Sequence, residues 1–216
     1  MVHVKGKELM EIDLTHPTKL YRYSERKWLE RSLELGEFRL RPASDYKQHE
    51  MDPARHDDEL FRISKSPASS VCITLKSTGQ IIKPIGDVVY RSEVGTNYFT
   101  ICFSKRWDEH LFDEFPNTDS CLVIHDVKEF SNRFHSAAEG LLPEWIGVDA
   151  AIEYGKQSKL GAVFSKPLLF ALQHEWRFAW RPSLPIEHLD PITIEIGSII
   201  DIAEIVDRSN HVVSRA

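Results

Sequence analysis

The sequence predicts one α+β domain with a twisted, mixed but mostly antiparallel sheet and two or three helices. Roughly eight to ten short segments have the apolar alternation of strands, whereas few segments combine caps with a helical apolar stripe. The strands do not alternate regularly with helices, which argues against a doubly wound parallel sheet. The 216 residues suffice for one core. We expect a polar N-terminal arm over 1–18 and the single domain over 19–216.

The first expected elements are a strand, a helix and a second strand. Residues 19–23 have the composition of a strand. Ser24 is placed to cap a helix over 25–35, and Gly36 is placed to end it. Residues 37–41 alternate polar and apolar side chains, which predicts the second strand.

The middle of the chain holds an acidic stretch followed by strands. Residues 43–59 are acidic and irregular, which predicts a long surface loop or a short exposed helix. Strands are expected at 71–75 and within 80–90. The clearest strand pattern covers 97–104, where apolar and polar side chains alternate. Residues 120–124 are almost continuously apolar, so we expect both faces of that strand to be covered.

The last third of the chain predicts one helix and several strands. Asp126 is expected to cap a helix over 127–139, with Glu129 as its capping-box partner and Gly140 at its end. Strands are predicted at 148–154, 175–180, 192–196 and 199–206, and a short apolar turn or helix at 167–172.

Composition and charge exclude several classes of protein. The net charge of −6 excludes a broad phosphate-neutralising surface. Three cysteines are too few for a disulfide scaffold, and we expect them to be buried free thiols in a reducing compartment. Neither a secretory signal nor a long apolar segment is found, so we expect a cytoplasmic protein with no membrane partner.

Familiar catalytic motifs are missing. The sequence contains no P-loop, no dinucleotide-binding glycine motif, no nucleophile elbow and no zinc-protease helix motif. The acidic stretch over 45–59 does carry metal-ligand residue types, and a metal-dependent nuclease or other hydrolase is therefore one alternative. A solvated loop is the favoured interpretation, so no metal is expected. The residues of ligand type are His49, Glu50, Asp52, His56 and Asp57.

Three predicted strands carry a polar stripe opposite an apolar one. A sheet with one wet face produces such stripes without any function, and an ion pair between Glu175 and Arg177 or Arg22 would then contribute little. However, Arg22 and Glu175 lie among aromatic residues, which predicts partial desolvation of the kind that functional sites use. The aromatic residues Trp176 and Trp180 share the apolar face and are expected in the core. The polar stripes are Arg22 with Ser24, then Tyr98, Thr100, Cys102 and Ser104, then Gln173, Glu175 and Arg177.

This order of residues resembles the ADP-ribosyltransferases of the Arg–Ser–Glu class. The elements are Arg22 on an early strand, Thr100 and Ser104 on a middle strand, and Gln173-His174-Glu175 late in the chain. The resemblance implies an ADP-ribosyltransferase-like fold and NAD as the substrate that is cleaved. It implies that Glu175 stabilises the oxocarbenium-like state and that Arg22 holds the pyrophosphate.

The same resemblance implies supporting roles. The hydroxyl of Ser104 or Thr100 would orient Glu175, and Gln173, expected on the same strand face as Glu175, would place the acceptor group. In a His–Tyr–Glu-like arrangement, Tyr21 or Tyr23 would take the place of Arg22 in binding the nucleotide.

A second resemblance covers about residues 19–206. The opening Leu20-Tyr21-Arg22-Tyr23, the central Cys102-Phe103-Ser104 and the late Glu175-Trp176-Arg177-Phe178 are similar to a widespread bacterial domain family of unknown function, often found near mobile elements and defence genes. The leading hypothesis is thus an NAD-dependent ADP-ribosyltransferase-like enzyme, as a toxin or anti-phage effector. Its acceptor would be a protein or a nucleic acid, and a toxin would have a cognate antitoxin. The alternative is a non-catalytic binding or regulatory module.

Overall fold

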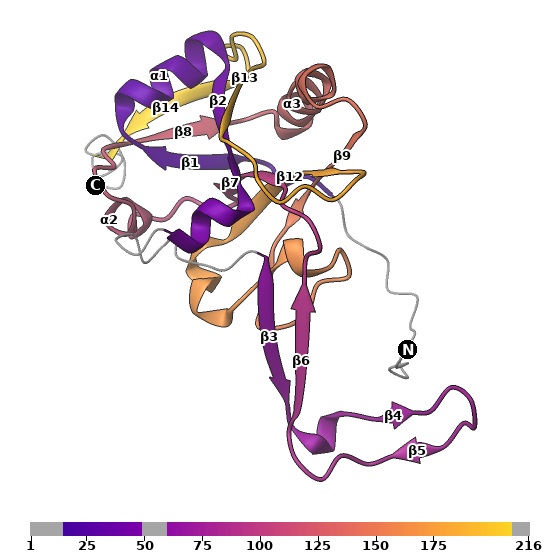
Figure 1. The fold of residues 1–216 in the computed structure, drawn as a ribbon. Helices are drawn as coiled ribbons and strands as arrows, with labels where there is room; N and C mark the ends of the chain where they lie inside the picture. Colours follow the sequence, from indigo (N-terminus) through magenta and orange to yellow (C-terminus); the bar gives the residue numbers. More distant parts are fainter. Residues whose placement is uncertain (1–14, 49–59, 209–216) are drawn as a thin grey trace.

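The computed structural model describes residues 15–48 and 60–208 (Figure 1). Most of the predicted arm over 1–18 lies outside these residues. The metal-ligand residue types of the acidic stretch also lie outside them, from His49 to Asp57. The part of 43–59 that is described forms the 3-10 helix η1 (Ala43–Gln48).

A branched sheet of eight antiparallel strands forms the centre of the molecule, which confirms the predicted class of fold. Its main path is β13-β2-β7-β1-β8-β14, and β12 pairs with β7 on one side and with β9 on the other. Among the described strands, only β10 (Glu153–Tyr154) and β11 (Ser165–Lys166) pair in parallel. The strands of the large sheet are β1 (Leu20–Ser24), β2 (Glu37–Pro42), β7 (Phe99–Ser104), β8 (Ser120–Ile124), β9 (Trp145–Ala151), β12 (Glu175–Pro182), β13 (Ile192–Glu195) and β14 (Ala203–Asp207).

Helix α1 (Arg26–Leu35) begins and ends for different reasons. The prediction that Ser24 caps it is wrong, because Ser24 is still paired in β1 and Glu25 takes the N-cap position without a side-chain cap bond. The prediction for Gly36 is confirmed. Its φ of 66° is left-handed, and a Cβ there would lie 2.0 Å from the carbonyl oxygen of Gly197. Only glycine allows this close approach.

Helix α3 (Val127–Leu141) follows β8 directly. The Asp126 carboxylate accepts a 3.0 Å hydrogen bond from the backbone N–H of Glu129, as the capping prediction required. Gly140 does not end the helix, which continues to Leu141. A four-residue helix α2 (Leu111–Glu114) lies between β7 and β8, and the 3-10 helix η4 (Leu168–Gln173) corresponds to the apolar turn or helix predicted at 167–172.

The main core lies between α3 and one face of the sheet. Phe103 from β7 and Phe178 from β12 contact Phe130 and Phe134 of α3, with ring centroids 5.3–5.8 Å apart. Trp176 and Trp180 belong to the same cluster, which confirms their predicted core position. All five residues of β8 are buried, as its continuous apolar sequence predicted. The alternation of β7 and β12 leaves their polar side chains on the opposite face.

The residues just before β1 are attached to this core. The carboxylate of Asp149 accepts hydrogen bonds from His16, His135, Ser131 and Trp176, at 2.8–3.1 Å. Burial alone would raise the pKa of Asp149, but the hydrogen bonds from His135, Ser131 and Trp176 lower it. His16, which was predicted to lie in the N-terminal arm over 1–18, thus contacts the core of the domain.

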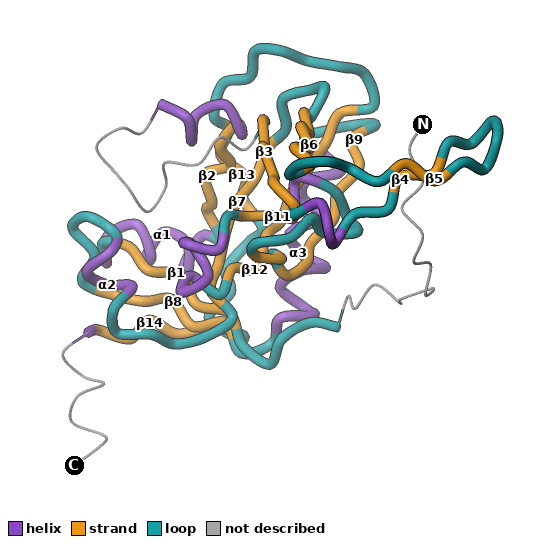
Figure 2. Tube along the Cα trace, turned by 90° about the horizontal axis from the view of Figure 1, so that it is seen from below, coloured by secondary structure: helices purple, strands orange, loops and turns teal. Residues whose placement is uncertain are grey.

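An antiparallel ribbon extends away from the large sheet (Figure 1). We define the ribbon as residues 61–93, which contain β3 (Phe61–Ser66), η2 (Ala68–Ser70), β4 (Ile73–Thr74), β5 (Ile81–Ile82) and β6 (Val88–Glu93). Strand β3 pairs with β6, and β4 with β5. Figure 2 shows β4 and β5 at the far end, remote from α1 and α2.

Several predicted boundaries differ from the structure. The strand predicted at 71–75 has only two residues, and β3 was not predicted. The strand predicted at 148–154 is divided between β9 and β10, and the one at 199–206 shortens to β14. The described cysteines are free, but only Cys121 is fully buried, because Cys72 and Cys102 are partly exposed. No helix within the described ranges is long and apolar enough to cross a membrane.

Candidate functional site

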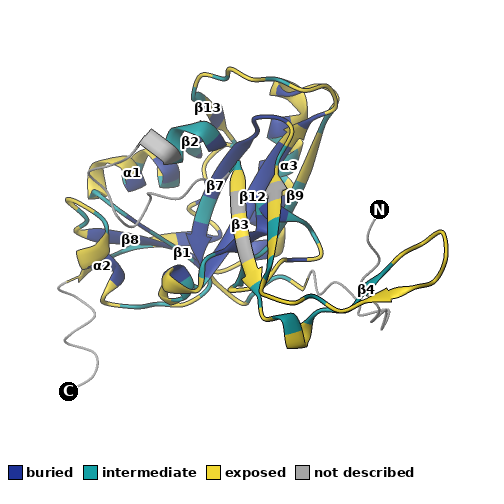
Figure 3. Cartoon of the chain, turned by 60° about the horizontal axis from the view of Figure 1, so that its bottom comes forward, coloured by how far each residue is buried: buried dark blue, intermediate teal, exposed yellow. Residues whose placement is uncertain are grey.

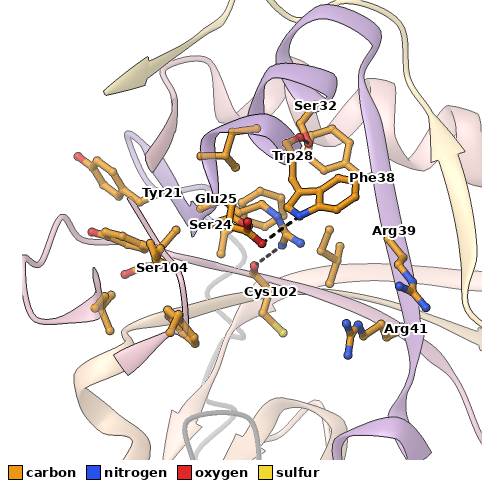
Figure 4. Close-up of a pocket in the computed structure, with 18 of the residues that line it drawn as sticks. Tyr21, Ser24, Glu25, Trp28, Ser32, Phe38, Arg39, Arg41, Cys102 and Ser104 are labelled. Atoms are coloured by element: carbon orange, nitrogen blue, oxygen red, sulfur yellow. Dashed lines mark hydrogen bonds between the residues drawn. The ribbon is translucent and has the colours of Figure 1, made fainter. Parts of the chain in front are cut away.

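A cavity of about 750 Å³ is lined by residues of β1, α1, β2, β7 and β12 (Figure 4). Its lining comes from both faces of the sheet, because Tyr21 shares a face with Ser104 and Glu175, whereas Arg22 lies on the other face with Phe103. Six of the seven predicted site residues line it: Tyr21, Arg22, Tyr23, Ser104, Gln173 and Glu175. The seventh, Thr100, is absent from its lining. The Thr100 hydroxyl is buried and donates a 2.9 Å hydrogen bond to the carbonyl of Phe178, so the prediction that it binds the nucleotide or orients Glu175 is wrong.

Glu175 lies at the inner end of the cavity in a buried ion group. Its Oε1 accepts a 2.7 Å bond from Nε of Arg177, and its Oε2 lies 2.7 Å from Nζ of Lys166. Glu175 is 3% exposed and Arg177 is fully buried, so this group is not the wet surface pair that was one interpretation of the sequence. Burial alone would raise the pKa of Glu175, but the charges of Arg177 and Lys166 lower it below its ordinary value. Glu175 is therefore a carboxylate at neutral pH.

Two further groups fix Glu175 from the polar side. The hydroxyl of Tyr154 accepts a 2.8 Å hydrogen bond from the backbone N–H of Glu175. The interaction with the Cys102 thiol also helps to lower the pKa of Glu175. Burial and the nearby charge of Glu175 raise the pKa of Cys102 to about 12, so its thiol stays protonated.

Ser104 lies opposite Glu175 in the pairing of β7 with β12, but its hydroxyl bonds elsewhere. It donates to the carbonyl of Arg106 at 2.8 Å and accepts from the N–H of the same residue at 3.1 Å. The implied role of Ser104 in orienting Glu175 is therefore wrong for this structure. Cys102, Lys166 and Arg177 hold the carboxylate instead.

Gln173 reaches the cavity by a different route from the one predicted. It ends η4 instead of belonging to β12, because His174 adopts a left-handed conformation with φ of 45° and separates the two elements. The expectation that Gln173 and Glu175 share a strand face is therefore wrong. Nevertheless Lys166 connects them, since its Nζ also donates a 3.2 Å hydrogen bond to Oε1 of Gln173.

Arg22 lies along one wall of the cavity. Its Nη1 donates a 3.1 Å hydrogen bond to the carbonyl of Cys102, and its guanidinium carbon lies 5.5 Å from the ring centroid of Phe103. The contact with Phe103 is a cation–π geometry. Arg22 is partly buried, so its side chain is held in place before any ligand binds.

The two tyrosines flank Arg22 on β1. Tyr23 is buried, accepts a 2.7 Å hydrogen bond from the N–H of Asp108, and meets Phe112 edge-to-face. Burial raises the pKa of both Tyr21 and Tyr23, so neither phenol ionises at neutral pH. Tyr23 is buried and packs as part of the cavity wall, whereas Tyr21 is only partly buried.

Residues that were not among the predicted site residues complete the cavity. Arg39 and Arg41 project from the polar face of β2, and Trp28 lies across from them on α1 (Figure 4). The alternation of β2, in which the arginines alternate with the buried residues Phe38 and Leu40, was the signal that could have placed them in the site. Lys166 had no such signal, because it lies on a two-residue strand.

The acidic residues at the rim are neutralised by neighbours outside the cavity. Glu25 is paired with Lys27 at 2.6 Å, and Glu37 is paired with Arg31. Arg22, Arg39 and Arg41 bring three guanidinium groups to the lining of the cavity. Guanidinium groups suit phosphate ligands in particular.

The described ranges, 15–48 and 60–208, contain no cluster of histidine, cysteine and acidic residues that could hold a metal ion. Comparisons of the chain with protein-family models, with curated proteins and with solved structures find no match.

Proposed function

We propose that this protein is an NAD-consuming enzyme of the ADP-ribosyltransferase type. The observation that carries the proposal is that Arg22, Gln173 and Glu175, which are far apart in sequence, line one cavity together with Ser104. The cavity volume of about 750 Å³ is within the usual range for small-molecule sites. The proposal includes an ADP-ribosyltransferase-like fold. The branched antiparallel sheet is compatible with such a fold.

Substrate binding would use the cationic wall. Arg22, Arg39 and Arg41 offer guanidinium groups to the diphosphate of NAD, for which bidentate hydrogen bonds are favourable. Trp28 and Tyr21 offer aromatic surfaces to the adenine or nicotinamide ring.

The chemistry would take place at the inner end, beside Glu175. The bond between the anomeric carbon of the ribose and the pyridinium nitrogen breaks, and its electron pair leaves on nicotinamide. A lone pair of the acceptor then forms a bond to the same carbon, and the acceptor loses its proton to solvent. Glu175, already ionised, would stabilise the positive charge that develops on the ribose. Its carboxylate retains lone pairs for a ribose hydroxyl although Lys166 and Arg177 already donate to it.

The test is nicotinamide release from NAD, followed by transfer of a label on the adenylate phosphate to the components of a bacterial lysate. We expect the wild type to release nicotinamide and Glu175→Gln to do so at least about 100-fold more slowly. Glu195→Gln, an exposed carboxylate on β13 outside the cavity, is the matched control. Thermal unfolding of each variant separates lost chemistry from lost folding. A folded wild type that releases no nicotinamide would contradict the proposal.

The identity of the acceptor follows from the same experiment. Label that resists protease but not nuclease is on a nucleic acid, and the reverse pattern indicates a protein. A toxin or anti-phage role predicts in addition that expression of the wild type, but not of Glu175→Gln, slows bacterial growth.

One observation favours a second candidate, a non-catalytic module that binds an anionic nucleotide. Both oxygens of Glu175 and the hydroxyl of Ser104 already have protein partners. Such an arrangement suits a site that binds a ligand without reacting with it. This module would bind ADP-ribose or NAD in calorimetry and leave NAD intact. The nicotinamide assay therefore distinguishes the two candidates.

A further inference from the structure

One face of the ribbon is exposed along β3 and β6. The cross-strand pairs Ile63 with Arg91 and Lys65 with Val89 place these four side chains on that face. All four are exposed, and Ile63 and Val89 are 60% and 52% exposed. On the other face, Val88 and Tyr90 are partly buried. Figure 3 shows exposed residues along β3.

The far end of the ribbon is also apolar and exposed. Ile81, Ile82 and Ile85 are exposed there, and Ile85 is completely so. A two-stranded ribbon without a covered apolar face is marginally stable in water. Exposed aliphatic patches of this kind are characteristic of surfaces that bind another protein. The ribbon is therefore a docking surface that is incomplete in a single copy of the chain.

The charge of the ribbon identifies the partner. Residues 61–93 contain five basic and two acidic residues, which gives a net charge of +3. The whole chain has 27 basic and 33 acidic residues, so the remainder has 22 and 31 and a net charge of −9. The basic apolar ribbon is thus complementary to the acidic remainder of this same chain. A nucleic acid is a less suitable partner for the ribbon, because the exposed isoleucine side chains cannot form hydrogen bonds with it.

We propose that the ribbon docks on the body of a second copy of this chain, so that two copies exchange ribbons around a two-fold axis. In such a dimer each copy provides one ribbon and one acceptor surface, and the interface closes without leaving a free ribbon. Ile63 and Val89 would form the apolar centre of each contact. Lys65 and Arg91 would face acidic groups at its edge. This inference does not depend on the proposed enzymatic activity.

The test is the mass of the full chain by sedimentation velocity over 1–100 µM, a range on the order of common dimer affinities. We expect a species of twice 24.9 kDa that dissociates as NaCl is increased. Ile63→Asp should weaken the dimer at least about 100-fold. Ser69→Asp, which adds the same charge at an exposed position of η2 away from the apolar face, should leave it unchanged. Circular dichroism checks that both variants fold.

Hydrogen exchange supplies a second readout that needs no variant. The amides of β3 and β6 should become more protected as the protein concentration rises. Three results would overturn the proposal: a wild type that is monomeric throughout the range, a dimer that Ile63→Asp leaves intact, or a monomer whose ribbon binds an oligonucleotide through Lys83.

Discussion

Glu175 combines two properties that usually exclude each other, since it is almost completely buried and remains charged. Its two cationic neighbours offset the cost of removing the carboxylate from water and fix its orientation, and the backbone N–H of Glu175 donates to the Tyr154 hydroxyl. A carboxylate held in this way does not need to reorganise when positive charge develops nearby. Such preorganisation is useful for electrostatic catalysis and equally for binding.

The lowered pKa of Glu175 has a consequence for stability against pH. Because the folded pKa lies below the ordinary value of 4.5, ionised Glu175 contributes stability that is fully present above pH 4.5 and is lost as pH falls through the folded pKa. We expect urea unfolding of the wild type to show a drop in stability from pH 5 downwards. Glu175→Gln should be less stable at pH 7 and should show a smaller drop. If the stability of this variant falls below pH 5 as steeply as that of the wild type, the lowered pKa of Glu175 is contradicted.

Arg39 and Arg41 allow a test of the cationic wall that does not depend on catalysis. A charge-assisted hydrogen bond contributes about 1.5–3 kcal/mol, which corresponds to roughly ten- to 150-fold in affinity. Arg41→Gln and Arg39→Gln should therefore each weaken ADP-ribose binding about tenfold or more in calorimetry. Arg181→Gln, an exposed arginine at the end of β12 and outside the cavity, is the control. Equal affinity in all three variants would show that the anion binds elsewhere.

At the scale of the elements, Gly36 connects α1 to β2 at a point that also touches the C-terminal part of the chain. Ile196 donates its N–H to the carbonyl of Gly36, and Ile199 donates to Leu33. The turn after α1 thus sets the position of β13 beside β2, and β2 carries the arginines of the cavity. A local requirement for a left-handed residue therefore affects the shape of the binding wall.

Two glycine substitutions should have opposite effects. Gly36→Ala introduces a Cβ 2.0 Å from a backbone oxygen in a left-handed conformation, so we expect a loss of more than about 2 kcal/mol in the free energy of unfolding. Gly140→Ala lies in α3 with open space around it, and we expect a gain of up to about 1 kcal/mol from helix propensity. Urea denaturation of both variants measures the difference. Similar effects of the two changes would contradict this account.

Elements with strong periodicity could be predicted from the sequence, and those formed by tertiary contacts could not. Strand β8 and the start of α3 match their predictions because apolar runs and a capping aspartate are local signals. The same alternation identified the outward face of β12 and hence Glu175. The path of Gln173 was predicted wrongly because a single left-handed histidine, His174, interrupts the strand pattern. Nothing local indicated that Lys166 pairs with Glu175.

At the scale of the whole molecule, the α+β class and the antiparallel sheet were predicted from the balance of strands and helices. The ribbon as a unit was not predicted. Strand β3 contains mostly polar residues, and the isoleucines of the ribbon are exposed, so they do not follow the apolar pattern of a strand that packs on a core. The convergence of Arg22 and Glu175 on one cavity required the strand order, in which β7 lies between β1 and β12. Strand order is a long-range property that a single sequence does not display.

The cavity is built from residues near both ends of the chain, and this affects the life of the protein during its synthesis. A ribosome that has produced β1, β2 and β7 has supplied the arginines but not yet Lys166 or Glu175. Nascent chains and prematurely terminated fragments that stop before residue 175 lack the buried carboxylate. Any activity that needs this carboxylate can therefore arise only after residue 175 has been synthesised.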